Sequence, residues 1–161
     1  MDPTAAPAER RRTRSAEETE RLGAALAPAL VPGDVIVLRG PLGAGKTRFV
    51  AGIARGIGAP ARVRSPSFTL VNEYRGDRLL LHLDLYRLEP EDVAALGLEE
   101  RLEEAVLAVE WGEKLPPRLR RDALTLAFEI VSERERAIAA TGAGPRGCAL
   151  AEAWRGMAAP R

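Results

Sequence analysis

One short stretch of the chain has a residue spacing that is specific for phosphate chemistry. Residues 40–47 read GPLGAGKT and match the phosphate-binding loop pattern G-x-x-x-x-G-K-[ST] at every fixed position. The glycines of this pattern let backbone N–H groups turn toward phosphate oxygens, the lysine reaches the outer phosphates, and the hydroxyl binds Mg2+. Lys46 and Thr47 therefore predict a site for a nucleoside triphosphate and magnesium. The alternative is a plain glycine-rich turn between a strand and a helix.

Two acidic residues follow apolar runs and are candidates to hold magnesium or to act on the attacking water. Asp84 ends the segment 78–84, and Glu110 ends the apolar segment that begins at residue 105. Open α/β sheets place ligand-facing residues at the carboxyl ends of strands, which favours both acids over ordinary surface carboxylates. The chain has no glutamine to orient water as Ras-type GTPases do. A carboxylate or an incoming partner must supply that function.

Other residues near these motifs give weaker chemical signals. The only asparagine, Asn72, is followed by Glu73, so the Asn-Lys-x-Asp tetrad typical of guanine recognition is absent and ATP is favoured over GTP. Trp111 directly follows Glu110 and either stacks on a base or caps the core. His82, the only histidine, is a weaker candidate for catalysis.

The segments around the loop are predicted to form a strand, a loop and a helix, as the motif requires. Residues 34–38 are a short apolar run typical of a buried strand, and residues 48–55 have apolar residues at helical spacing. The helix is expected to end near Gly56 or Gly58, before Pro60. Residues 64–71 begin polar and turn into a strand, which suits either a loop near the nucleotide or a plain ordered turn.

The rest of the chain alternates between helical and strand patterns. A capping box at residues 15–18 predicts a helix over 16–27. Pro90 as a first helical residue and Gly97 as a stop predict one or two short helices over 90–104. Residues 123–131 and 136–141 are expected to form a hairpin around 132–135, followed by a short helix near 148–157.

Length and composition favour one cytoplasmic domain. With 161 residues and 46% apolar content, the chain supports one sizeable core. The net charge of +1 gives no global field for nucleic acid or membrane, and the single Cys148 excludes an internal disulfide and a cysteine zinc site. No signal peptide core or run of about 18 apolar residues is present.

The predicted fold is a P-loop NTPase domain of three α/β/α layers, with a mostly parallel sheet extended by an antiparallel C-terminal hairpin. Residues 1–14 are predicted to be a flexible tail, 15–141 the ATPase domain, and 142–161 a C-terminal helix or tail on the same domain. The arginines at 10–12 and 14 are read as part of a solvated terminus, with an RNA-contacting arm as the alternative.

Four motifs in order make the chain resemble the TsaE family. They are GPLGAGKT at 40–47, SPSFTLV at 65–71, HLDLYR at 82–87 and VEW at 109–111. The resemblance implies a bacterial ATPase of tRNA threonylcarbamoyladenosine biosynthesis. It also implies two protein partners, the threonylcarbamoyl transferase and its inactive paralogue, with tRNA contacted indirectly through the complex and a chain that is monomeric when free.

The resemblance also assigns roles that the residues alone leave open. It implies that Lys46 and Asp84 are catalytic, that Thr47 and Glu110 bind magnesium, and that residues 65–69 form a switch-like loop. Ser67 and Arg48 stand where the family often has threonine. The implied ATP-binding residues are Pro41, Leu42, Gly43, Ala44, Gly45, Lys46, Thr47, Arg48 and Trp111.

Two other functions fit a short P-loop chain. A small-molecule kinase usually needs a lid and an arginine-bearing acceptor site, and no arginine-rich insertion separates the motifs. A nucleotide-dependent binding module would bind ATP with little hydrolysis. Since the site has no glutamine and no evident arginine finger, the leading expectation is an Mg-dependent ATPase that is slow alone and depends on partners.

Overall fold

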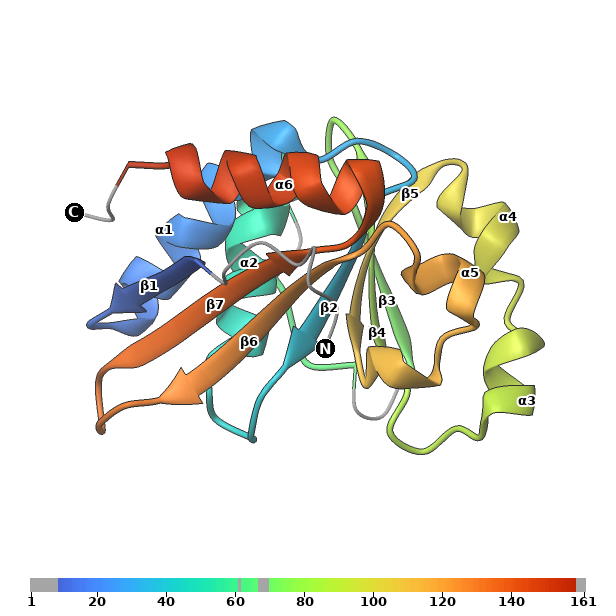
Figure 1. Ribbon diagram of the computed structural model, residues 1–161, viewed down its shortest axis with the longest axis horizontal. Helices are drawn as coiled ribbons and strands as arrows, with labels where there is room; N and C mark the ends of the chain where they lie inside the picture. The colour runs from blue at the N-terminus through green and yellow to red at the C-terminus, as the bar shows by residue number, and fades with distance from the viewer. Residues whose placement is uncertain (1–8, 61, 67–69, 159–161) are drawn as a thin grey trace.

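The strands of the chain form a single twisted sheet with helices on both faces (Figure 1). The computed structural model describes residues 9–60, 62–66 and 70–158. Within these residues the sheet has seven strands in the order β1-β7-β6-β2-β5-β4-β3. The strands are β1 (Glu9–Thr13), β2 (Val35–Arg39), β3 (Val71–Arg75), β4 (Leu79–Asp84), β5 (Ala105–Glu110), β6 (Leu124–Ile130) and β7 (Arg136–Gly142).

The sheet is mixed, with a parallel centre and antiparallel edges. β6, β2, β5 and β4 run parallel to one another, whereas β7, β1 and β3 each join the sheet through an antiparallel pairing. The predicted β6–β7 hairpin is confirmed. The predicted mostly parallel sheet holds only for the four central strands, because strands at both ends pair in the antiparallel direction.

The prediction of a flexible tail over residues 1–14 is wrong for its last part. Residues 9–13 form β1 and pair with β7, with Glu9 opposite Ala140 and Thr13 opposite Arg136. Residues 1–8 lie outside the described residues. The three consecutive arginines hid this strand, because alternate positions of an edge strand tolerate charged side chains. Arg11 shows why the strand is ordered: its guanidinium donates to the carbonyl of Trp154 at 2.7 Å.

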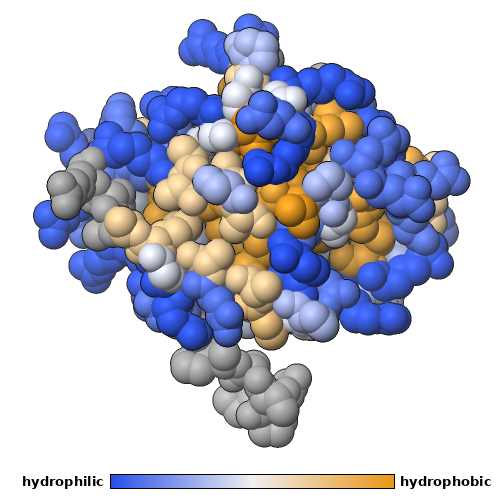
Figure 2. Space-filling view, turned by 90° about the horizontal axis from the view of Figure 1, so that it is seen from above, coloured by the Kyte–Doolittle hydropathy of each residue, from blue (hydrophilic) through white to orange (hydrophobic). Residues whose placement is uncertain are grey.

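Three longer helices cover one face of the sheet. They are α1 (Ala16–Leu26), α2 (Lys46–Gly56) and α6 (Gly144–Gly156). The strand residues Ile36 and Leu38 point into the core beneath them, which includes Phe49 of α2 and the fully buried Trp154 of α6. Seen from the α6 side, the surface has weakly apolar residues and some strongly apolar ones among hydrophilic residues (Figure 2).

Glycine lets α1 and α2 pack closely and so fixes the helix that follows the phosphate loop. A Cβ on Gly23 of α1 would lie 2.1 Å from the carbonyl oxygen of Phe49, and one on Gly52 of α2 would lie 1.9 Å from that of Glu20. Any larger residue at either position would push the helices apart. The start of α1 is set by Ser15, whose Oγ accepts from the N–H of Glu18.

The capping box predicted at residues 15–18 is present in altered form. Ser15 is the N-cap as expected, but the carboxylate of Glu18 accepts from the N–H of Arg14 rather than from that of Ser15. The acid therefore also fixes the link between β1 and α1.

Short helices cover the opposite face. They are α3 (Pro90–Ala94), α4 (Leu98–Leu102) and α5 (Pro117–Arg120), together with the 3-10 turn η2 (Gly112–Lys114); a further 3-10 turn, η1 (Ala27–Ala29), follows α1. Val93, Leu98 and Leu119 pack there against Val35 and the odd-numbered residues of β4 and β5. Gly97, predicted as a helix stop, has φ +66° and separates α3 from α4. Three layers are thus present, with a thinner layer on this side.

Candidate nucleotide site

The phosphate loop has the backbone that the motif requires. β2 ends at Arg39 and α2 begins at Lys46, so residues 40–45 form the turn between them. Gly40, Gly43 and Gly45 have φ values of +142°, +80° and +102°. Residues other than glycine rarely adopt such positive values. A Cβ on Gly40 would also lie 2.6 Å from the carbonyl oxygen of Phe128. The sequence prediction of strand, loop and helix is confirmed.

A cavity of about 690 Å³ opens in front of this loop and collects most of the predicted site residues. Its lining comes from the loop, from the start of α2 and from the carboxyl ends of β4 and β5. Of the predicted site residues it contains Pro41, Leu42, Gly43, Gly45, Lys46, Thr47, Arg48, Asp84, Glu110 and Trp111. Ala44 is the exception, because its side chain is fully buried in the core. Ala44 can therefore contact a ligand in the cavity only through its backbone.

Lys46 and Glu110 meet at the base of this cavity. The ammonium of Lys46 donates to the carbonyl of Gly40 at 2.5 Å and lies 3.3 Å from Oε1 of Glu110. The other carboxylate oxygen, Oε2, lies 3.2 Å from Nε2 of the buried His82. Burial raises the pKa of Glu110, but the hydrogen bond from His82 and the charge of Lys46 outweigh it, so the pKa lies below its ordinary value. Glu110 is therefore held as a carboxylate.

Asp84 lies beside Glu110, at the carboxyl end of β4 where the sequence predicted it. The two residues face each other in the register of β4 and β5. Oδ1 of Asp84 accepts from the N–H of Tyr86 at 3.0 Å, which orients the carboxylate toward the cavity that it lines. Two carboxylates are thus placed on adjacent strands and held by different donors.

Trp111 forms a wall of the cavity together with an aromatic residue that the sequence reasoning did not select. Its ring centroid lies 5.0 Å from that of Tyr86, and 42% of Trp111 is exposed, so it does not cap the core. Lys114 donates to the carbonyls of Tyr86 and Leu88 at 2.6 and 2.8 Å, and its ammonium lies 5.8 and 5.9 Å from the centroids of the two rings. These contacts fix both rings.

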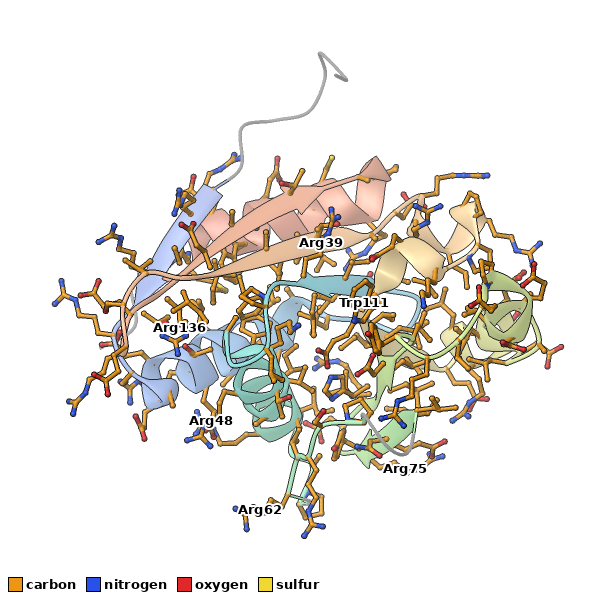
Figure 3. All side chains as sticks on the ribbon, turned by 90° about the horizontal axis from the view of Figure 1, so that it is seen from below. Arg39, Arg48, Arg62, Arg75, Trp111 and Arg136 are labelled. Carbon is orange, nitrogen blue, oxygen red and sulfur yellow. The ribbon has the colours of Figure 1, made fainter. Side chains whose placement is uncertain are left out.

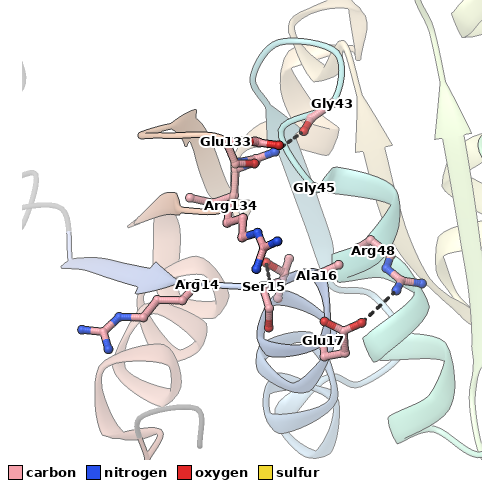
Figure 4. A pocket seen from close by; sticks show the side chains of 11 residues that line it. Arg14, Ser15, Ala16, Glu17, Gly43, Gly45, Arg48, Glu133 and Arg134 are labelled. Atoms are coloured by element: carbon pink, nitrogen blue, oxygen red, sulfur yellow. Dashed lines mark hydrogen bonds and ion pairs between the residues drawn. The ribbon is translucent and has the colours of Figure 1, made fainter.

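A second cavity, of about 380 Å³, lies on the other side of the loop (Figure 4). It shares Gly43 and Gly45 with the first cavity and is closed by the start of α1, by Arg48 and by the β6–β7 turn. Arg136 donates to the carbonyl of Gly43 at 3.1 Å and to carbonyls of the turn, so it ties the hairpin to the loop. In the view from below (Figure 3), Arg136 and Arg48 lie toward α1 and α2, and Trp111 lies nearer the centre.

No sequence signal pointed to this second cavity. Its residues are Arg14, Ser15, Ala16, Glu17, Thr19, Gly43, Gly45, Arg48, Glu133, Arg134 and Arg136. Most come from segments far from the motifs. The only available hint was the loss of regular pattern at residues 132–135, which marks a turn but gives no position in space.

The oxygen donors of the first cavity fit magnesium rather than a metal held by protein alone. No group of three or more His, Cys, Asp or Glu side chains that could hold a metal occurs among the described residues. Mg2+ usually binds through one or two protein oxygens together with phosphates and water. The Thr47 hydroxyl and the Glu110 carboxylate, next to a phosphate loop, are such a donor set.

Comparison with known proteins gives consistent matches. A family model described as "Threonylcarbamoyl adenosine biosynthesis protein TsaE" matches residues 13–138. A tRNA threonylcarbamoyladenosine biosynthesis protein TsaE from Bacillus subtilis is 39% identical over 137 residues, covering 84% of this chain and 86% of that protein. The protein of the same name from Nostoc is 47% identical over 106 residues, covering 62% of this chain and 65% of its own length.

A solved structure also matches the fold of this chain. A crystal structure of Bacillus subtilis YdiB superposes with a TM-score of 0.77 at 34% identity and covers 94% of this chain and 96% of that one. None of the helices formed by the described residues combines the length and the apolar character needed to cross a membrane.

Proposed function

Because the chain belongs to the TsaE family of tRNA threonylcarbamoyladenosine biosynthesis, we propose that it is the ATP-binding and ATP-hydrolysing accessory subunit of this modification. The modified base would be the adenosine next to the anticodon of tRNAs that read codons starting with A. The chain would act with the threonylcarbamoyl transferase and its inactive paralogue in the cytoplasm and would be monomeric when free. The observation that carries this proposal is the cavity in which Lys46, Asp84 and Glu110 meet the phosphate loop.

The two cavities suggest how ATP lies on the loop. The outer phosphates belong in the larger cavity, because Lys46 and both acids line it. The base and ribose then extend past Gly43 and Gly45 into the second cavity, toward Arg48 and the β6–β7 turn. In this arrangement Trp111 lies beside the terminal phosphate rather than on the base.

Three side chains with oxygen atoms would bind the magnesium ion and orient the attacking water. Thr47 and Glu110 would hold the magnesium ion, which when bound neutralises charge on the phosphates. Asp84 would orient the attacking water, since its carboxylate lines the same cavity and is positioned by the Tyr86 N–H. The loop amides and Lys46 would stabilise charge on the outer phosphates.

Hydrolysis by the chain alone is expected to be slow. The sequence has no glutamine to place water. Arg48, which lines the cavity, lies 3.6 Å from Glu20 and 3.9 Å from Glu17 in ion pairs that hold it toward α1. The predicted switch-like loop at 65–69 lies beside the cavity at Ser65, and residues 67–69 fall outside the described residues. A partner that supplies a group to orient the water would complete the site.

Linkage gives a direct test of the partner proposal. If the partners favour the ATP-bound state, ATP must tighten partner binding by the same factor by which the partners tighten ATP binding. The affinity for the transferase and its paralogue should be measured with a non-hydrolysable ATP analogue, with ADP and without nucleotide. Lys46→Ala is the matched control and should show one affinity in all three states. Equal wild-type affinity in the three states would contradict the switch.

A further inference from the structure

His82 is a buried polar residue for which the proposed reaction has no stated use. The side chain is fully buried in β4, where the residue pairs with Asn72 of β3 and Ala108 of β5. Nε2 lies 3.2 Å from Oε2 of Glu110, while Nδ1 is buried with no hydrogen-bond partner among the described residues. Buried polar atoms are nearly always paired. Among the residues that the structure describes, the imidazole thus has one polar contact, and that contact is to Glu110.

This contact fixes which imidazole nitrogen is the donor. A carboxylate only accepts hydrogen bonds, so Nε2 bears a proton and donates to Glu110. The other nitrogen, Nδ1, has no hydrogen-bond partner among the described residues.

The two oxygens of Glu110 have partners of different kinds. Oε2 contacts His82, which is fully buried within the sheet, whereas Oε1 contacts the ammonium at the end of the long Lys46 side chain. Phosphates bound at the loop would draw the Lys46 ammonium toward them. Oε1 would then be free to face the cavity, while Oε2 would still be held by His82.

We propose that His82 is a positioning residue, whose Nε2–H holds Oε2 of Glu110 so that Oε1 is presented to the magnesium ion of the bound nucleotide. This inference rests on the proposed function. Asp84 is oriented separately by the Tyr86 N–H, so the effect is confined to Glu110. Hydrogen-bond partners that orient a metal ligand typically contribute 10- to 100-fold to metal affinity.

A matched pair of amide variants tests the proposal. His82→Gln places an amide N–H at about the reach of Nε2, whereas the shorter His82→Asn keeps a buried amide that does not reach Glu110. ADP affinity is measured by calorimetry with Mg2+ and with a chelator, and Mn2+ binding to the ADP complex is followed by electron paramagnetic resonance. We expect His82→Gln to keep the wild-type gain in affinity from metal. His82→Asn should lose about 10- to 100-fold of metal affinity, with metal-free ADP affinity unchanged.

Each other outcome has a definite meaning. If metal raises the ADP affinity of His82→Asn as much as that of the wild type, the proposal is overturned. If His82→Asn loses the same ADP affinity with and without metal, His82 has only a structural role. If His82→Asn does not fold, His82→Leu replaces it, because it removes the donor while filling the site with apolar atoms. A wild-type protein that binds ADP without any metal dependence would instead contradict the magnesium site of the proposed function.

Discussion

The two cavities on either side of Gly43 and Gly45 are built in different ways. The larger one joins the phosphate loop to Asp84 and Glu110, which end two adjacent parallel strands. The smaller one depends on contacts between distant parts of the chain, such as that between Arg136 and Gly43, which are 93 residues apart. If ATP binds as proposed, the residues for phosphate chemistry come from short motifs, whereas the space for the rest of the nucleotide depends on contacts between distant segments of the chain.

The charges of the two cavities also differ in burial. In the larger cavity the side chains of Lys46 and Glu110 are 14% and 11% exposed, whereas that of Glu17 in the smaller cavity is 67% exposed. Water and salt screen exposed charges strongly and buried ones much less. Substitutions in the larger cavity should therefore have the larger effects on turnover.

Lys46→Ala should give the largest effect. It removes the ammonium that we propose contacts the outer phosphates, and the loss of one preorganised contact of this kind commonly lowers the rate by about 10²- to 10³-fold. Partner-stimulated ATP turnover measures the effect, and thermal unfolding checks that the variant is folded. Near-normal turnover by a folded variant would remove the distinction between the cavities.

Replacement of the two acids should separate their roles within the larger cavity. Asp84→Asn should bind ATP with normal magnesium dependence but fail to hydrolyse it, because the water-orienting carboxylate is gone. Glu110→Gln should instead require more Mg2+ for binding and for turnover. A magnesium titration of both variants makes the comparison, and the same magnesium dependence in both would show that the roles are divided wrongly.

Arg136→Ala should have a smaller effect and act on binding. It releases the β6–β7 turn from the Gly43 carbonyl, and an exposed charged hydrogen bond of this kind is worth about 1 kcal/mol, or several-fold in ATP affinity. Arg121→Ala, at an exposed arginine outside both cavities, is the matched control. If the base lies in the smaller cavity, Arg136→Ala should weaken ATP binding more than tripolyphosphate binding. Equal weakening of both ligands would place the base elsewhere.

Lowering the pH should produce the smallest of these effects, a loss of thermal stability. Because the pKa of Glu110 is lowered by folding, its contribution to stability is present above the pKa of the unfolded carboxyl, about 4.3, and is lost as pH falls through the lower folded value. Metal-free wild type should therefore lose more thermal stability than Glu110→Gln between pH 6 and pH 3. Parallel pH profiles of Tm would contradict this coupling.

Much of the larger cavity was predictable from sequence because its signals are local. Glycines with positive φ precede Lys46, and each carboxylate follows an apolar run, so residue type and spacing were enough to place Asp84 and Glu110 at the carboxyl ends of strands. Tyr86 was within a recognised motif, but its role depends on the neighbouring Trp111 ring and on Lys114, which a linear pattern does not reveal.

The features that were not predicted depend on long-range contacts. β1 was assigned to a flexible tail because its arginines give no apolar alternation, and its order comes from β7 and from Arg11 contacts to the end of α6. The antiparallel pairing of β3 with β4 was also not predicted, whereas that of β6 with β7 was. The partner of His82 could not be predicted either, since pairing of its Nε2 with Glu110 depends on the register of β4 and β5.

We propose that this chain is an ATPase whose site is completed by partners. The most direct test is steady-state ATP hydrolysis by the wild-type chain alone, with the transferase and its paralogue, and with both partners and tRNA, using Asp84→Asn as the control. We predict slow hydrolysis alone, a clear rise with the partners and none in the variant. A wild-type rate that is the same in all three conditions, or an Asp84→Asn rate equal to wild type, would contradict the account.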